Sequence, residues 1–138
     1  MAIFCLFLLV LFIPPVESLY TLKILSNSSH PFARCLDGTQ GAYYFRPSPS
    51  GTKNVKIFFE GGGWCTSDGD CYARSLTALG SNAKLPPTSQ EPSGYCGSGF
   101  LSDDPKVNPT TYDWNAIYVP YCDGSVRDYL HFLFHRIG

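Results

Sequence analysis

Four short segments carry the apolar, aromatic and β-branched residues that are typical of β-strands. They are residues 19–25, 42–46, 54–60 and 114–120. Turn-forming residues such as Pro, Gly, Ser and Asn separate them. The third segment contains a continuous apolar run from Ile57 to Phe59, which predicts a strand buried on both faces inside a sheet.

The segment between the third and fourth strands has a different pattern. Residues 70–80 place Leu76 and Leu79 on one helical face, and Gly80 follows as a stop signal, so a helix is predicted there. Residues 81–109 are rich in Pro and Gly and read as a loop. Strands, a helix, a loop and a further strand indicate an α/β arrangement.

The two ends of the chain differ from the part between them. The first 13 residues are uncharged and apolar, too short to span a bilayer, and small residues follow, so residues 1–18 are predicted to be a secretory signal cleaved after Ser18. A buried strand or a membrane anchor is the alternative. Residues 126–138 crowd apolar side chains without a wide polar face. We therefore expect a signal at 1–18, one domain at 19–125 and a divergent tail at 126–138.

Charge and cysteine content narrow the class of partner. Without residues 1–18, which contain Glu17, the chain has ten basic and ten acidic residues, which argues against nucleic acid or an anionic membrane as partner. Five cysteines remain, so one lacks a partner within the chain if the others form disulfides. Asn27 begins an N-x-S sequon, which fits a secreted, glycosylated protein.

Three consecutive glycines, Gly61 to Gly63, stand directly after the third predicted strand. The spacing G-G-G-W-C matches neither a dinucleotide-binding turn nor a phosphate loop. A glycine turn after the third strand of an α/β-hydrolase supplies an N–H group to an oxyanion, and this chemistry fits the strand context. A merely flexible turn is the alternative. A disulfide between Cys65 and Cys71 would hold the turn, and Trp64 would line a pocket or pack in the core.

Metal sites are weaker candidates. His131 and His135 have the i, i+4 spacing of zinc ligands, but Phe132 stands where a metalloprotease needs Glu, and a third ligand is not evident. The acidic pairs at 68–70 and 103–104 could bind calcium, although turn-rich surroundings favour a role in capping the backbone. No metal is expected.

Five ordered motifs carry a family resemblance. They are CLDGTQGAYYFR at 35–46, FEGGGWC at 59–65, TALGS at 77–81, GFLSDDPKVNP at 99–109 and WNAIYVPYCDG at 114–124. Over about residues 35–125 the chain resembles the pectin acetylesterase family. The resemblance implies a secreted serine carboxylesterase that hydrolyses acetyl esters on pectin or related O-acyl substrates, without a cofactor. It also implies an α/β-hydrolase-like fold, disulfide-stapled, with a mostly parallel sheet and flanking helices.

The resemblance also implies roles for particular residues. Gly62 and Gly63 take the positions of the oxyanion amides, and Trp64 takes a substrate-binding place. The implied disulfides are Cys65–Cys71 and Cys35–Cys122, which leaves Cys96 unpaired.

One departure from the family is large. The family's nucleophile is a Ser in a G-x-S-x-G elbow downstream of the YCDG motif, with an Asp and a His later still, and the present sequence contains no G-x-S-x-G. We therefore expect the N-terminal part of such an enzyme, monomeric, extracellular and inactive on its own. The alternative is a non-catalytic, secreted, disulfide-stapled module that binds glycans or another partner.

Overall fold

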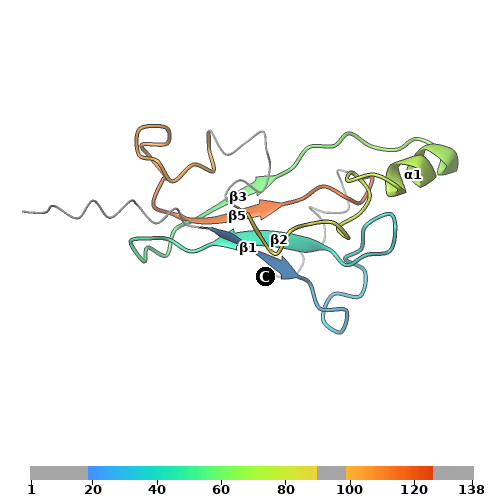
Figure 1. The fold of residues 1–138 in the computed structure, drawn as a ribbon, viewed down its shortest axis with the longest axis horizontal. Helices are drawn as coiled ribbons and strands as arrows, with labels where there is room; N and C mark the ends of the chain where they lie inside the picture. The colour runs from blue at the N-terminus through green and yellow to red at the C-terminus, as the bar shows by residue number, and fades with distance from the viewer. Residues whose placement is uncertain (1–18, 90–98, 126–138) are drawn as a thin grey trace, which may run out of the picture.

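The structure is a computed structural model that describes residues 19–89 and 99–125. Predictions for the signal segment, Cys96, His131, His135 and the tail lie outside the described residues. The elements follow the chain order β1 Tyr20–Ile24, β2 Ala42–Arg46, β3 Val55–Phe59, α1 Asp68–Ser75, β4 Thr88–Ser89 and β5 Asn115–Val119 (Figure 1). All four expected strands are present. The short strand β4, which lies in the segment predicted to be a loop, was not expected.

The strands form one five-stranded sheet in the order β3-β5-β2-β1-β4. Within the described residues, β3 and β5 are parallel, whereas the pairs β1–β2, β1–β4 and β2–β5 are antiparallel. The expectation of a mostly parallel sheet is therefore wrong for this part of the chain. A parallel pair needs a long crossover connection, and here the segment containing α1 provides the one between β3 and β5.

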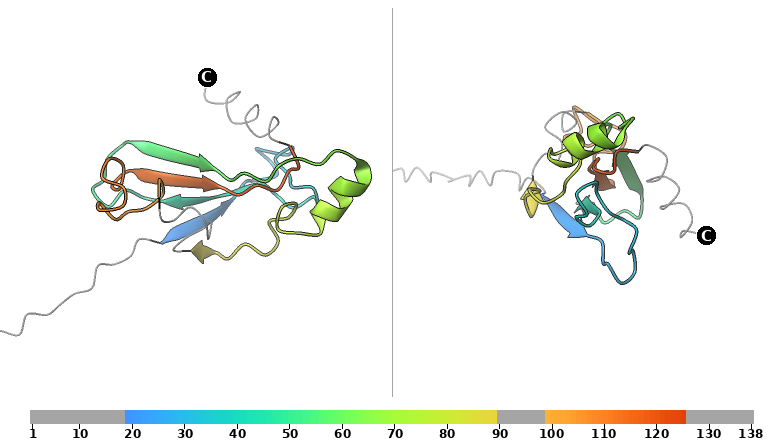
Figure 2. Two further views of the ribbon diagram at one scale, coloured as in Figure 1. Left: turned by 90° about the horizontal axis from the view of Figure 1, so that it is seen from above. Right: turned by 90° about the vertical axis from the view of Figure 1, so that its right-hand side faces the viewer.

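Helix α1 lies beyond one end of the sheet rather than over a face, as Figure 1 and the left view of Figure 2 show. It starts earlier than predicted because Ser67 Oγ accepts a hydrogen bond from the N–H of Asp70 and so caps the helix. It ends at Ser75, and Leu76 beyond it is exposed rather than packed. No helix within the described residues is long and apolar enough to cross a membrane.

One face of the sheet carries the core. Its buried cluster consists of Tyr20, Tyr44, Leu101, Ala116 and Tyr118. Phe58 stacks on Tyr118 with ring centroids 6.0 Å apart. The core therefore joins β1, β2, β3 and β5 to the loop that contains Leu101.

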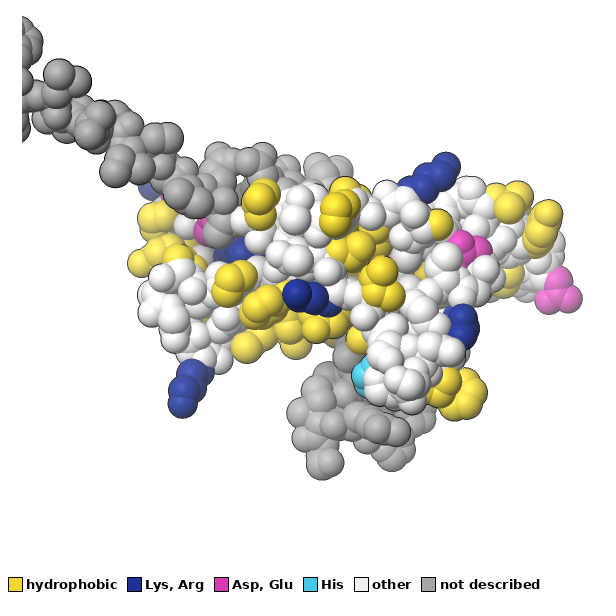
Figure 3. Space-filling view, turned by 60° about the horizontal axis from the view of Figure 1, so that its bottom comes forward, with side chains coloured by type: hydrophobic (Ala, Val, Ile, Leu, Met, Phe, Trp, Pro, Cys, Tyr) yellow, Lys and Arg dark blue, Asp and Glu magenta, His cyan; other side chains and the backbone are white. Residues whose placement is uncertain are grey.

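The side chains on the opposite face of β3, which is an edge strand within the described residues, are exposed. Val55, Ile57 and Phe59 are 46%, 47% and 36% exposed, so the prediction of a strand buried on both faces is wrong here. Figure 3 shows several exposed hydrophobic side chains on the viewed face of the molecule. The strand register places Lys23 and Phe45 on the face of the sheet opposite Tyr118. An unaided sequence pattern cannot distinguish such a strand from an interior one.

Two cationic side chains, Arg46 and Lys56, are buried on the core face of the sheet. Arg46 is 1% exposed and forms an ion pair with Asp103 at 3.2 Å, and its guanidinium lies 5.2 Å from the ring centroid of Tyr20. Burial raises the pKa of Tyr20 to about 12, although Arg46 opposes this shift. The expectation that Asp103 only caps a turn is therefore incomplete.

Lys56 is the second buried cation. It is 2% exposed, and its Nζ donates to the carbonyl of Ser102 at 3.1 Å. Burial, and then the nearby Arg46, lower the pKa of Lys56 to about 8. Arg46 and Lys56 thus fasten the loop around Ser102 to the sheet through polar contacts.

Candidate functional site

The glycine turn begins where β3 ends, and the segment after β5 lies beside it because the two strands are parallel neighbours. Glu60 bridges the two segments. Its N–H donates to the carbonyl of Val119, and its Oε2 accepts from the N–H of Tyr121, each at 2.9 Å. The turn therefore rests on the chain that leaves β5.

Two of the three glycines are required by their surroundings. A Cβ on Gly62 would collide with the ring of Tyr121. Gly63 has a φ of +77°, in the left-handed region that favours glycine. Gly61 has a negative φ and open space where a side chain would lie. Glycine is therefore required at Gly62 by the close approach of the Tyr121 ring and at Gly63 by the backbone conformation.

Side chains from two directions bind the carbonyl groups of the turn. Arg74 Nη1, from α1, donates to the carbonyl of Gly62 at 2.6 Å, and Arg74 Nη2 donates to that of Trp64 at 3.4 Å. Tyr121 Oη donates to the carbonyl of Gly63 at 2.7 Å. Burial raises the pKa of Tyr121, with a smaller contribution from Asp123 that Arg74 opposes, so this hydroxyl keeps its proton at neutral pH.

The N–H groups of the turn are left available. Among the described residues, those of Gly62, Gly63 and Trp64 donate to no protein acceptor. The next one, of Cys65, donates to the carbonyl of Gly124 at 3.2 Å. Adjacent N–H groups without an acceptor, on a turn with bound carbonyls, can hold an anionic oxygen.

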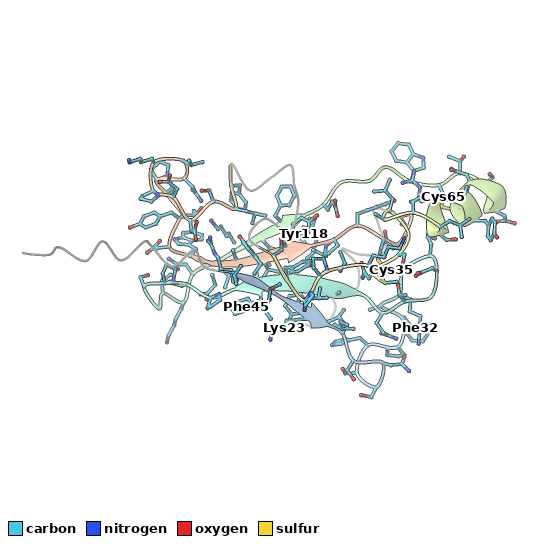
Figure 4. All side chains as sticks on the ribbon, in the orientation of Figure 1. Lys23, Phe32, Cys35, Phe45, Cys65 and Tyr118 are labelled. Carbon is cyan, nitrogen blue, oxygen red and sulfur yellow. A yellow bond between two sulfur atoms is a disulfide. The ribbon has the colours of Figure 1, made fainter. Side chains whose placement is uncertain are left out.

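Two disulfides lie around this turn, and they are the pairs that the family resemblance implied. Cys65–Cys71 links the end of the turn to α1, with Cα atoms 5.1 Å apart, and Cys35–Cys122 spans 87 residues. Figure 4 shows Cys35 and Cys65 towards the same end of the molecule as α1. Gly124 packs against the first of these disulfides, since a Cβ there would lie 2.8 Å from Cys65 Sγ.

Trp64 does not pack in the core. Its side chain is 65% exposed, so the core-packing alternative is wrong, while the substrate-binding role stays a prediction. The sequon residue Asn27 is also exposed, and its Oδ1 accepts from Arg34 Nη2 at 2.7 Å.

One residue of each acidic pair binds a backbone N–H group, as the capping interpretation predicts. Asp70 Oδ2 accepts from the N–H of Thr66 at 3.0 Å, and Asp104 Oδ1 accepts from that of Lys106 at 2.8 Å. Within the described part of the chain, no group of three His, Cys, Asp or Glu side chains is arranged to hold a metal ion.

The roles of Arg74 and Tyr121 were not predicted from the sequence. Arg74 lies 12 positions after Gly62, and Tyr121 lies 58 positions after Gly63. Neither spacing is a local pattern. The one available signal was that each residue falls within or beside a motif that resembles the pectin acetylesterases.

Comparison with known proteins gives a consistent result. The family model "Pectinacetylesterase" matches residues 15–128. The chain is 40% identical over 110 residues to pectin acetylesterase 5 of Arabidopsis thaliana, which covers 79% of this chain and 24% of that protein. It is 37% identical over 113 residues to the inactive palmitoleoyl-protein carboxylesterase notum1b of Danio rerio, which covers 80% of this chain and 74% of that protein. The chain thus spans about a quarter of the length of the pectin acetylesterases that it matches.

Proposed function

The chain belongs to the pectinacetylesterase family, and we propose that its glycine turn is the oxyanion-binding part of a carboxylesterase site. The observation that carries this proposal is the set of free N–H groups at Gly62 and Gly63, on a turn whose carbonyls are bound by other side chains.

The turn would act on the tetrahedral intermediate of ester hydrolysis. A serine oxygen attacks the ester carbonyl, and the carbonyl oxygen becomes negatively charged. The N–H groups of Gly62 and Gly63 would donate to this oxygen. A donor of this kind contributes about 3–4 kcal/mol to transition-state stabilisation, because it is already oriented before charge develops.

The substrate class we propose is an acetyl ester on pectin, or on a related O-acylated molecule. The exposed indole of Trp64, which follows the turn, would contact the substrate. The chemistry needs neither metal nor organic cofactor. The two disulfides support an extracellular location, because such bonds persist in oxidising compartments.

The 138 residues contain no G-x-S-x-G motif, so we propose that this chain does not turn over esters by itself. The direct test is a chimera in which residues 19–125 replace the matching segment of pectin acetylesterase 5 of Arabidopsis thaliana. We expect the chimera to hydrolyse p-nitrophenyl acetate, whereas the isolated chain stays at the background rate.

Two variants of the chimera test the turn itself. Gly62→Pro removes one N–H donor, and kcat should fall by about 10²- to 10³-fold. Gly62→Ala is the matched control, since it makes the same contact with the ring of Tyr121 but keeps the N–H group. Equal activity of both variants in a folded chimera would contradict the oxyanion assignment.

A second function is supported by two observations. Trp64 and Tyr72 are both strongly exposed aromatic side chains, and the relative that the chain covers over 74% of its length is named inactive. A non-catalytic module would bind an oligosaccharide through these rings. Calorimetric titration with acetylated oligogalacturonides, with Trp64→Ala as the variant, distinguishes this function from catalysis.

A further inference from the structure

We propose that Arg74 and Tyr121 are positioning residues of the oxyanion turn, and that they fix the N–H groups of Gly63 and Trp64 as its oriented donors. The catalytic meaning of this assignment rests on the proposed function. The assignment of orientation rests on the contacts alone. It adds Trp64 N–H to the donors that the resemblance implied.

The argument starts from the rigidity of the peptide group. In a trans peptide the C=O of one residue and the N–H of the next lie in one plane and point in opposite directions. The described residues contain no cis peptide bond. A side chain that holds the carbonyl of Gly62 therefore also sets the direction of the N–H of Gly63.

Each anchored carbonyl has its own donor. Arg74 Nη1 holds the carbonyl of Gly62 at 2.6 Å, which orients the N–H of Gly63. Tyr121 Oη holds the carbonyl of Gly63 at 2.7 Å, which orients the N–H of Trp64. Among the described residues no donor reaches the carbonyl of Gly61. The N–H of Gly62 therefore has no carbonyl anchor, and the close contact of Gly62 with the ring of Tyr121 restrains it instead.

Such anchors matter because glycine loses more conformational freedom on ordering than any other residue. An oxyanion donor is effective only if its direction is set before the reaction. Arg74 is itself restrained, since α1 is linked to the turn by Cys65–Cys71. Tyr121 is restrained by its N–H bond to Glu60 and by its ring against Gly62. The turn is therefore held from the helix and from the β5 side at once.

The test is the orientation and order of individual N–H bonds in the oxidised, full-length chain labelled with ¹⁵N. We expect the N–H bonds of Gly63 and Trp64 to have order parameters of about 0.85 in the unsubstituted chain. Tyr121→Phe should lower the value for Trp64 below about 0.6 and change its residual dipolar coupling. Arg74→Met should do the same at Gly63. Arg74→Lys, which keeps the charge and one donor, should restore part of the order.

The chain offers matched controls for both variants. Tyr44 also donates its hydroxyl to a backbone carbonyl, that of Pro86, at 2.7 Å. Arg34 also donates to two backbone carbonyls. Tyr44→Phe and Arg34→Met should leave the N–H bonds of Gly63 and Trp64 unchanged, which separates positioning from a general loss of stability.

Unchanged order and couplings at Trp64 in Tyr121→Phe would overturn the proposal, because that variant removes a single hydroxyl. If Arg74→Met does not fold, the measurement on Tyr121→Phe is sufficient to decide the proposal. An inactive chimera with ordered N–H bonds would contradict the proposed function but not this assignment. Disordered N–H bonds in the unsubstituted chain would contradict this assignment alone.

Discussion

The ring of Tyr121 occupies the space that a side chain on Gly62 would need. A residue directly after β5 therefore restricts the residue type in the turn directly after β3. Glycine is therefore needed in this turn for side-chain packing, at Gly62, as well as for backbone conformation, at Gly63.

Substitution of the first two glycines should separate these requirements. Gly62→Ala should lower the free energy of unfolding by about 1–3 kcal/mol, because the added methyl displaces the ring of Tyr121. Gly61→Ala should change it by less than about 1 kcal/mol, since nothing lies near its Cβ. Urea unfolding of both variants checks this, and equal losses would contradict the packing argument.

The buried Lys56 predicts an unusual pH dependence. Its pKa is lowered from 10.5 to about 8 in the folded chain, so the unfolded chain binds more protons between these values. The free energy of unfolding therefore gains a contribution from Lys56 as the pH rises through 8. Below pH 8 the full cost of burying the charge is present.

A pair of variants isolates this contribution. The free energy of unfolding of the unsubstituted chain should rise relative to Lys56→Met by about 1–2 kcal/mol between pH 7.5 and 9.5. Lys53→Met, at an exposed position, is the control for other titrating groups. A difference between the chain and Lys56→Met that does not change with pH would refute the shifted pKa.

The two disulfides should differ in their contribution to stability. Loop-closure entropy predicts a loss of about 4–5 kcal/mol for Cys35→Ala/Cys122→Ala, whose cysteines are 87 positions apart. It predicts about 2 kcal/mol for Cys65→Ala/Cys71→Ala, with a separation of 6. Thermal unfolding of the two double variants measures the difference. If removal of Cys65–Cys71 caused the larger loss, its contribution to stability would come from contacts that hold the glycine turn and not from chain entropy.

The sequon at Asn27 gives a prediction about secretion. In a eukaryotic secretory host, Asn27 should carry an N-linked glycan, because the site lies on an exposed turn. Asn27→Gln and Ser29→Ala should both abolish the mass shift on endoglycosidase treatment. Ser28→Ala keeps the sequon and should retain it. A secreted chain without any glycan would contradict the prediction.

Strand positions were predictable because they depend on local composition. β2 has the bounds expected from the aromatic run that contains Tyr43 and Tyr44, and β1, β3 and β5 are each one residue shorter at both ends than expected. It was harder to predict which face of each strand is buried. The apolar Ile57 is exposed while Lys56 is buried, because Lys56 meets the carbonyl of Ser102, 46 positions away.

In the candidate site, too, the local sequence pattern was predictable and the contacts between distant segments were not. The glycine run could be connected to oxyanion chemistry from its position after a strand. Its anchors, Arg74 and Tyr121, depend on how α1 and the segment after β5 fold back onto the turn. Such contacts have no periodicity in the sequence, so only the structure assigns them.

The separation of Cys35 from Cys122 also has a consequence in time. At a synthesis rate of roughly 5–20 residues per second, 87 residues take roughly 4–17 seconds to follow Cys35. During that interval Cys65, Cys71 and Cys96 become available, and each can form a non-native disulfide with Cys35. Early closure of Cys65–Cys71 therefore removes two of the three competing thiols before Cys122 is synthesised, and leaves Cys96 as the remaining one.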